Sequence, residues 1–176
     1  MGMIRWPLPY DHEQNRHEIV GRYIAQVLFM ERFINMSLLD LGASPRKLKR
    51  AKLNRKIEDM RSFIARPELA LNEWDDLPDL MERVARHRND FAHRMFERNA
   101  IPPHHEPVRS PGYVHEELSE EELRDQEWEA FEASEICRQL SERLHLAPLN
   151  PGKHFGRTTP LRPPDWPLST PWSATR

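Results

Sequence analysis

Several residue types that define other classes of protein are scarce in this chain of 176 residues. It has one cysteine, Cys137, which excludes an intramolecular disulfide, and no apolar run long enough for a membrane span or the core of a signal peptide. The formal net charge is only −2, so no overall field indicates a nucleic-acid or membrane partner. We therefore expect a protein of the reducing cytoplasm that has no membrane partner.

Strand-forming patterns are also rare, and what remains favours helices. The chain has only 6 glycines and few Val, Ile or Thr runs that alternate with polar residues, whereas Arg, Glu, Leu and Ala are frequent. Its 16 prolines gather in the first residues, in the stretch 100–118 and in the last thirty residues, so the middle is almost free of helix breakers. We expect an all-α fold, an antiparallel bundle of four to five helices.

Apolar spacing and capping residues locate four long helices. The first ends at Gly42, and Ser44 before Pro45 provides an N-cap and first residue for the second, which ends before Pro67. The third runs from about residue 77 to 99, and the fourth opens at Ser119 with a capping box and ends near residue 146.

The domain limits follow from these helices. We expect an extended N-terminal arm over residues 1–11, a helical bundle over 12–147 and a proline-rich tail over 148–176. The tail has no hydrophobic periodicity, so we expect it to be disordered, although Trp166 and Trp172 could dock on a partner or on the bundle.

Charge is segregated along the chain although the total is close to neutral. Between residues 45 and 61, basic residues outnumber acidic ones eight to two, and between residues 116 and 135 acidic residues outnumber basic ones ten to one. Two interpretations stay open for the basic segment. It is either a solvated helix face that lies beside the acidic one, or a surface that contacts phosphates of a nucleic acid.

One arginine lies where the third helix should carry a packing residue. In a projection at about 100° per residue, Arg88 falls in the centre of the apolar arc, among Val84, Phe91 and their neighbours. Asn89 and His93, which are one turn apart, lie on an adjoining ridge. A guanidinium at such a position has to be paired with an acid, reach a polar cavity or face a second subunit.

The segment 88–93, RNDFAH, resembles the signature of the HEPN superfamily (higher eukaryotes and prokaryotes nucleotide-binding domains). These are α-helical bundles, many of them metal-independent RNases of toxin, phage-defence and RNA-processing systems. Their motif is an Arg, commonly followed by Asn, with four to six residues before a His, in a late helix of the bundle. Arg88, Asn89 and His93 match it, and the resemblance covers roughly residues 12–146.

The resemblance implies an endoribonuclease that needs neither metal nor cofactor. His93 would act as general base or acid on the ribose 2′-hydroxyl, Arg88 would stabilise charge on the phosphorane, and Asn89 would orient His93 or the phosphate, leaving a 2′,3′-cyclic phosphate. The family further implies RNA as substrate, a homodimer with a composite active site, and for toxins a cognate antitoxin protein. His104 and His105 could line the edge of the cleft. The alternative is a non-catalytic bundle of the same architecture that binds protein partners.

Overall fold

The computed structural model describes the backbone of residues 12–100 and 118–163, and the side chains of 18–91 and 118–163. Every regular element in these two stretches is helical, which confirms the all-α class. None of the described helices is long and apolar enough to cross a membrane. The elements are α1 (His12–Asp40), α2 (Pro45–Arg50), α3 (Leu53–Ile64), the 3₁₀ turns η1 (Pro67–Leu69) and η2 (Asn72–Trp74), α4 (Leu77–Ala100), α5 (Glu120–Leu146) and η3 (Ala147–Leu149).

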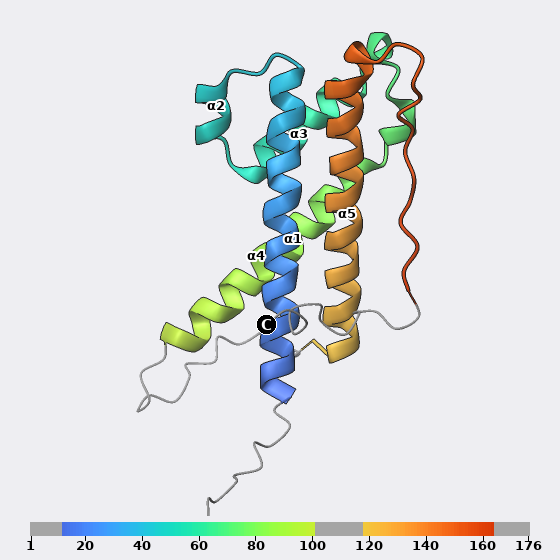
Figure 1. Cartoon of the computed structure of the whole chain (residues 1–176). Coiled ribbons are helices and arrows are strands. Elements are labelled where there is room, and N and C mark those ends of the chain that lie inside the picture. Colours follow the sequence, from blue (N-terminus) through green and yellow to red (C-terminus); the bar gives the residue numbers. More distant parts are fainter. Residues whose placement is uncertain (1–11, 101–117, 164–176) are drawn as a thin grey trace, which may run out of the picture.

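The two longest helices, α1 and α5, lie side by side and run in the same direction (Figure 1). Arg22 pairs with Glu127 near their first halves, and Asp40 approaches His145 at their far ends, so the residue numbers rise together. The expected antiparallel order therefore fails for this pair. The path of α4 explains why α1 and α5 are parallel. α4 runs back diagonally behind α1, so that the chain enters α5 near the end of the bundle where α1 begins.

The antiparallel order does hold for α3 with α4. Arg61 of α3 pairs with both Asp79 and Glu82 in the first turns of α4, each at 2.7 Å, while Asn54 at the start of α3 shares a hollow with Asn89. As the residue numbers rise on one helix they fall on the other. These two helices form a hairpin that packs on one side of α1.

The second helix expected from the sequence is broken into α2 and α3. Ala51 and Lys52 are extended, with ψ angles of 135° and 156°. Leu48 and Leu53 are both buried, yet in one continuous helix they would point about 140° apart. The break lets both leucines reach the core.

Two helix boundaries were predicted correctly from capping residues. Gly42 follows α1 in the left-handed region with φ of 87°, a conformation that favours glycine. Ser119 Oγ accepts from the Glu122 amide at 3.1 Å, and the Glu122 carboxylate accepts from the Ser119 amide at 2.6 Å, which completes the capping box of α5.

Part of the proline-rich segment differs from the expected disorder. Residues 150–163 form an extended strap along α5 (Figure 1), whereas residues 164–176, with Trp166 and Trp172, lie outside the described part. Arg157 pairs with Asp76 and donates to the Glu73 carbonyl at 2.9 Å, and Thr158 donates its amide to Gln139 at 2.8 Å. Ion pairs and backbone hydrogen bonds hold this strap in place. The sequence did not predict its order, because such interactions produce no hydrophobic periodicity.

Candidate functional site

The first half of α4 places Arg88 within its packing stripe. Val84, one turn earlier, is fully buried, and Phe91, nearly one turn later, is only 6 % exposed. The Arg88 side chain between them is partly buried. The position that the sequence indicated for this arginine is therefore the position that the fold gives it.

Tyr23 of α1 covers this part of α4. Its hydroxyl donates to the Val84 carbonyl, and its ring meets the Phe91 ring edge-on, with centroids 4.9 Å apart and an interplanar angle of 76°. Burial raises the pKa of Tyr23, and the nearby Glu129 carboxylate adds to that effect, while the Arg88 backbone and charge oppose it. The phenol therefore stays a protonated donor.

In the sequence, Tyr23 is one of the apolar residues that recur every three or four positions and so predict the first helix. The series is Ile19, Tyr23, Val27, Met30, Ile34, Leu38 and Leu41. A buried tyrosine usually needs a hydrogen-bond partner for its hydroxyl, and that requirement was the one available signal that it contacts another helix. It also means that Val84 and Phe91 on the α4 stripe are covered by α1 of the same chain.

The Arg88 guanidinium has no hydrogen bond or ion pair with another described side chain. A partly buried cation without an anionic partner loses hydration that nothing replaces, which disfavours the site unless an anion occupies it. Arg88 provides a planar donor array that matches phosphate or carboxylate geometry. It is therefore the best candidate for an anion contact on this segment of α4.

Asn89 faces a different neighbour from Arg88. It is exposed and lines a hollow of about 260 Å³ between α3 and α4. The other residues that line it are Asn54, Glu58, Glu82 and Arg86. Arg88 and Asn89 thus lie on adjoining ridges of α4, the first toward α1 and the second toward α3.

His93 lies on α4 one turn after Asn89. Its side chain is outside the described residues, as are His104 and His105. The structure thus brings Arg88 and Asn89 to one short segment of α4, and it puts the backbone of His93 directly after them.

The α5 flank of α4 carries a charge cluster that sequence reasoning did not single out. Glu129 accepts from Arg83 at 3.2 Å and lies 3.5 Å from a ring nitrogen of His87. The hydrogen bond with His87, followed by that with Arg83, holds the pKa of Glu129 below its usual range against the opposing effect of burial. Both basic groups on this flank are therefore already partnered.

The basic and acidic runs of the sequence do not pair with each other where the structure describes them. Acidic residues of α5 form ion pairs with other parts of the chain. Glu127 pairs with Arg22 of α1, and Asp125 pairs with Arg162 of the strap. Five basic residues around α2 are exposed and have no acidic partner among the described residues. They are Arg46, Lys47, Lys49, Arg50 and Lys52. The basic residues of α2 are therefore solvated, as one of the two interpretations expected, but none of them pairs with a described acidic residue of α5.

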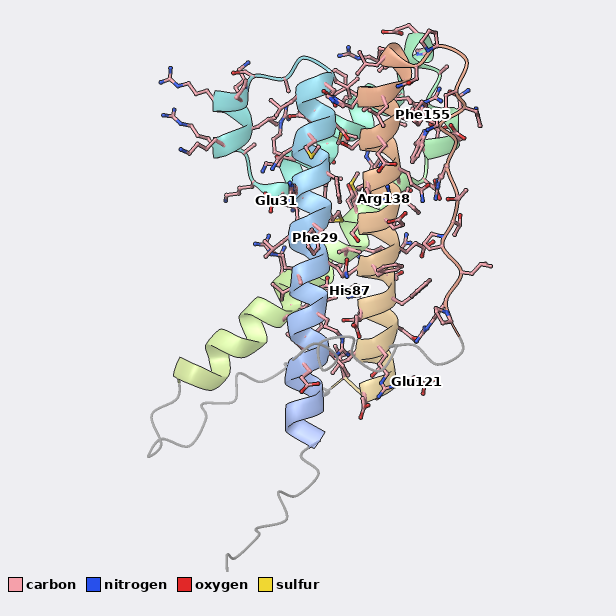
Figure 2. All side chains as sticks on the ribbon, in the orientation of Figure 1. Phe29, Glu31, His87, Glu121, Arg138 and Phe155 are labelled. Atoms are coloured by element: carbon pink, nitrogen blue, oxygen red, sulfur yellow. The ribbon has the colours of Figure 1, made fainter. Side chains whose placement is uncertain are left out.

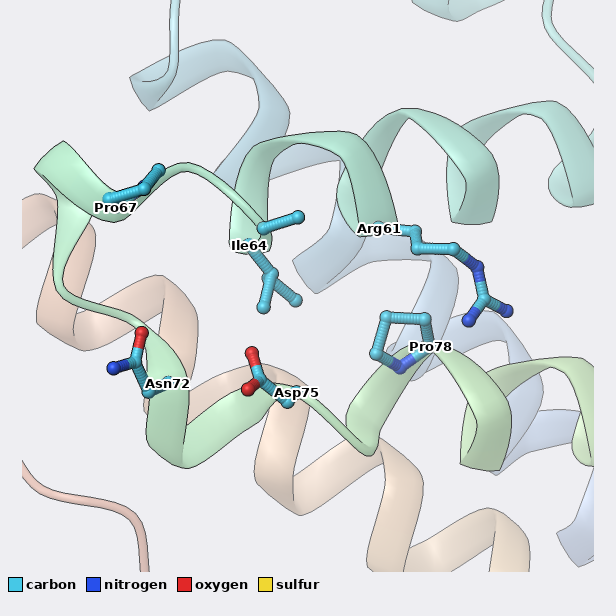
Figure 3. Close-up of a pocket in the computed structure, with 7 residues that line it drawn as sticks. Arg61, Ile64, Pro67, Asn72, Asp75 and Pro78 are labelled. Atoms are coloured by element: carbon cyan, nitrogen blue, oxygen red, sulfur yellow. The ribbon is translucent and has the colours of Figure 1, made fainter.

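A second hollow lies where α3 ends and α4 begins (Figure 3). It measures about 530 Å³, and Asp75 and Asn72 border it. Its one cation, Arg61, is held by Asp79 and Glu82. None of the motif residues lines this hollow, and its basic group is already neutralised, so it is a weaker candidate than the Arg88 segment.

Two further observations concern metal binding and nucleophilic catalysis by cysteine. Within residues 18–91 and 118–163, no group of three or more His, Cys, Asp or Glu side chains is arranged to hold a metal ion. Burial raises the pKa of the Cys137 thiol, so this cysteine is a core residue and a poor nucleophile.

Comparisons with family models, with curated proteins and with solved structures find no match for this chain.

Proposed function

We propose that this chain is a metal-independent endoribonuclease of the HEPN type, as found in toxin and phage-defence systems. The observation that carries the proposal is Arg88, a partly buried guanidinium on the packing stripe of α4 without a described acidic partner. Phosphoryl chemistry uses such a fixed cation to stabilise charge on the phosphorane. Asn89 on the next ridge and His93 one turn later complete the match to the motif.

In the proposed reaction, His93 takes the proton from the 2′-hydroxyl while that oxygen attacks the adjacent phosphorus. The bond from phosphorus to the 5′-oxygen breaks, the leaving oxygen receives a proton from water, and the 2′,3′-cyclic phosphate remains. Arg88 stabilises the negative charge on the non-bridging oxygens. The reaction needs no metal, because every proton transfer is assigned to a side chain or to water.

The exposed basic residues around α2 support RNA as the substrate. Each phosphate contact from a lysine or arginine releases counterions and strengthens binding at low salt. α2 precedes α3, and the first residues of α3 share the hollow that holds Asn89. A strand bound at α2 would therefore pass toward the motif segment of α4.

The test is cleavage of varied RNAs by purified protein in EDTA, with analysis of the product ends. We expect 2′,3′-cyclic phosphate ends, and a loss of about 10²- to 10³-fold in rate for His93→Ala and for Arg88→Ala. His145→Ala and Arg66→Ala are matched controls, because both residues are exposed and lie outside α4. All variants are first shown to be folded by circular dichroism.

A second candidate, a non-catalytic bundle that binds protein, is favoured by the apolar outward surface of α1. The same assay separates the two candidates. Absence of cleavage across the RNAs, or equal cleavage by wild type and both α4 variants, would exclude the nuclease and leave the binding role.

A further inference from the structure

The side of α1 that points away from the bundle is unusually apolar. Four large side chains on it are strongly exposed: Leu28 at 58 %, Phe29 at 49 %, Met36 at 40 % and Leu39 at 43 %. Figure 2 labels Phe29 on this outward side. A helix that packs on a single core normally turns charged and polar residues to solvent. We call this surface, bounded by residues 18 and 39, the outer face of α1.

The positions of the outer face read the same in both directions along the helix. The exposed positions from 18 to 39 are Glu18, Gly21, Ala25, Leu28, Phe29, Arg32, Met36 and Leu39. These positions are symmetric about the midpoint between Leu28 and Phe29, because each exposed position before the midpoint has a counterpart at the same distance after it. A second α1 laid antiparallel would therefore bring exposed positions level with exposed positions.

The residue sizes are complementary in that arrangement. Gly21 comes level with the Met36 of a second helix, and Ala25 with its Arg32, so the smallest residues of the face receive long side chains. Apart from its chain neighbours and the backbone of α1, no atom lies within 4 Å of a Cβ built on Gly21, so the space above it is open. We propose that the outer face of α1 binds a second copy of this chain, antiparallel, with the two-fold axis between residues 28 and 29.

Charge favours the antiparallel order over the parallel one. A parallel pair would set Arg32 against Arg32 and Glu18 against Glu18, with Gly21 facing Gly21 across a void. In the antiparallel pair the two Arg32 residues are about 10 Å apart along the axis, from a rise of 1.5 Å per residue. Each aliphatic stem then covers a partner Ala25 while its guanidinium reaches water at the rim.

This association is separate from the proposed nuclease site. Tyr23, which packs on the segment of α4 that carries Arg88, lies on the buried side of α1, and α4 crosses behind α1, so the pair leaves the two Arg88 segments apart (Figure 1). An interface made by one helix pair is at the low end of interface sizes, so we expect weak, reversible dimers. Dimerisation and RNA cleavage can accordingly fail independently.

Cysteine cross-linking of the full chain tests the geometry. Leu28→Cys and Phe29→Cys lie beside the axis, so each is expected to form a disulfide-linked dimer with its own copy under mild oxidation. Leu39→Cys is the matched control, because its two copies would be about 30 Å apart at 1.5 Å per residue. The native Cys137 is buried and does not interfere. Cross-linking of Leu39→Cys as fast as Leu28→Cys would overturn the antiparallel pair.

Sedimentation velocity across a concentration series tests the association itself. We expect concentration-dependent dimers for the wild type, at least a tenfold weaker dimer for Phe29→Glu, and wild-type behaviour for Leu161→Glu. Leu161 is 90 % exposed on the strap and is not part of the outer face, so it controls for loss of any exposed leucine. A wild type that stays monomeric throughout the series overturns the proposal. If Trp166→Ser combined with Trp172→Ser then allows dimers, the occupant is the tail of the same chain instead.

Discussion

The two faces of α1 are both apolar, yet only one of them is buried. Tyr23, Met30, Ile34 and Leu38 on the inner face are at most 1 % exposed, whereas Phe29 and three other large residues on the outer face are about half exposed. Both sets of residues recur every three or four positions, so each set stays on one side of the helix, and only the inner side is packed against α3, α4 and α5. Apolar character alone therefore does not predict burial in this helix, and the two faces should respond differently to substitution.

The largest contrast is expected for truncation on the two faces. Ile34→Ala removes a fully buried side chain and leaves a cavity, so it should lower the free energy of unfolding by about 4 kcal/mol. Met36→Ala on the outer face should change it by less than about 0.5 kcal/mol in dilute, monomeric protein. Urea denaturation of both variants measures this contrast. Equal losses would mean that the outer face is buried in the monomer.

The same periodicity explains how much of the fold was predictable. Ser119 caps α5 as expected, and six apolar residues of α1 are buried as their spacing predicts, whereas Leu41 at the end of the same series is only half-buried. The six are Ile19, Tyr23, Val27, Met30, Ile34 and Leu38. Ala51 was not recognised as the end of a helix, because it carries no breaking signal. The parallel direction of α5 was also missed, because it depends on the diagonal path of α4 and leaves no local pattern.

The candidate site was predictable only along one helix. Spacing on α4 alone placed Arg88 on the packing stripe and Asn89 on the ridge beside it, and both positions agree with the structure. The contacts between helices were not predictable: the hydroxyl of Tyr23 on the Val84 carbonyl depends on how α1 crosses α4. Glu129 belongs to the acidic segment 116–135, and nothing in the local sequence indicates which acid of that segment contacts His87.

Two arginines of α1 sharpen the comparison between its faces. Arg22 holds the carboxylate of Glu127 at 2.5 and 3.2 Å, and Glu127 is only 2 % exposed. Arg22→Met leaves that carboxylate buried without its partner, so we expect a loss of about 3 kcal/mol in the free energy of unfolding. Arg32→Met on the outer face is the matched control and should be close to neutral. Thermal and urea unfolding measure both, and a neutral Arg22→Met would show that Glu127 is hydrated.

The smallest expected effect concerns the polar border between α4 and α5. Hydrogen bonds from His87 and Arg83 hold the pKa of Glu129 below its usual range. A carboxyl with a depressed pKa in the folded state stabilises the protein above its unfolded pKa, about 4.3, and this contribution is lost as the pH falls through the folded value. Glu129→Gln should therefore cost about 0.5 kcal/mol at neutral pH, because the group is partly exposed.

The check on Glu129 is urea unfolding of wild type and Glu129→Gln from pH 7 to pH 3. The two stability curves should converge as Glu129 becomes protonated, because glutamine mimics the neutral acid. Glu121→Gln, on an exposed carboxylate in the first turn of the same helix, provides the control for removal of one negative charge. A difference that stays constant down to pH 3 would place the effect in packing, and the α4–α5 border would then owe nothing to the charge of this carboxylate.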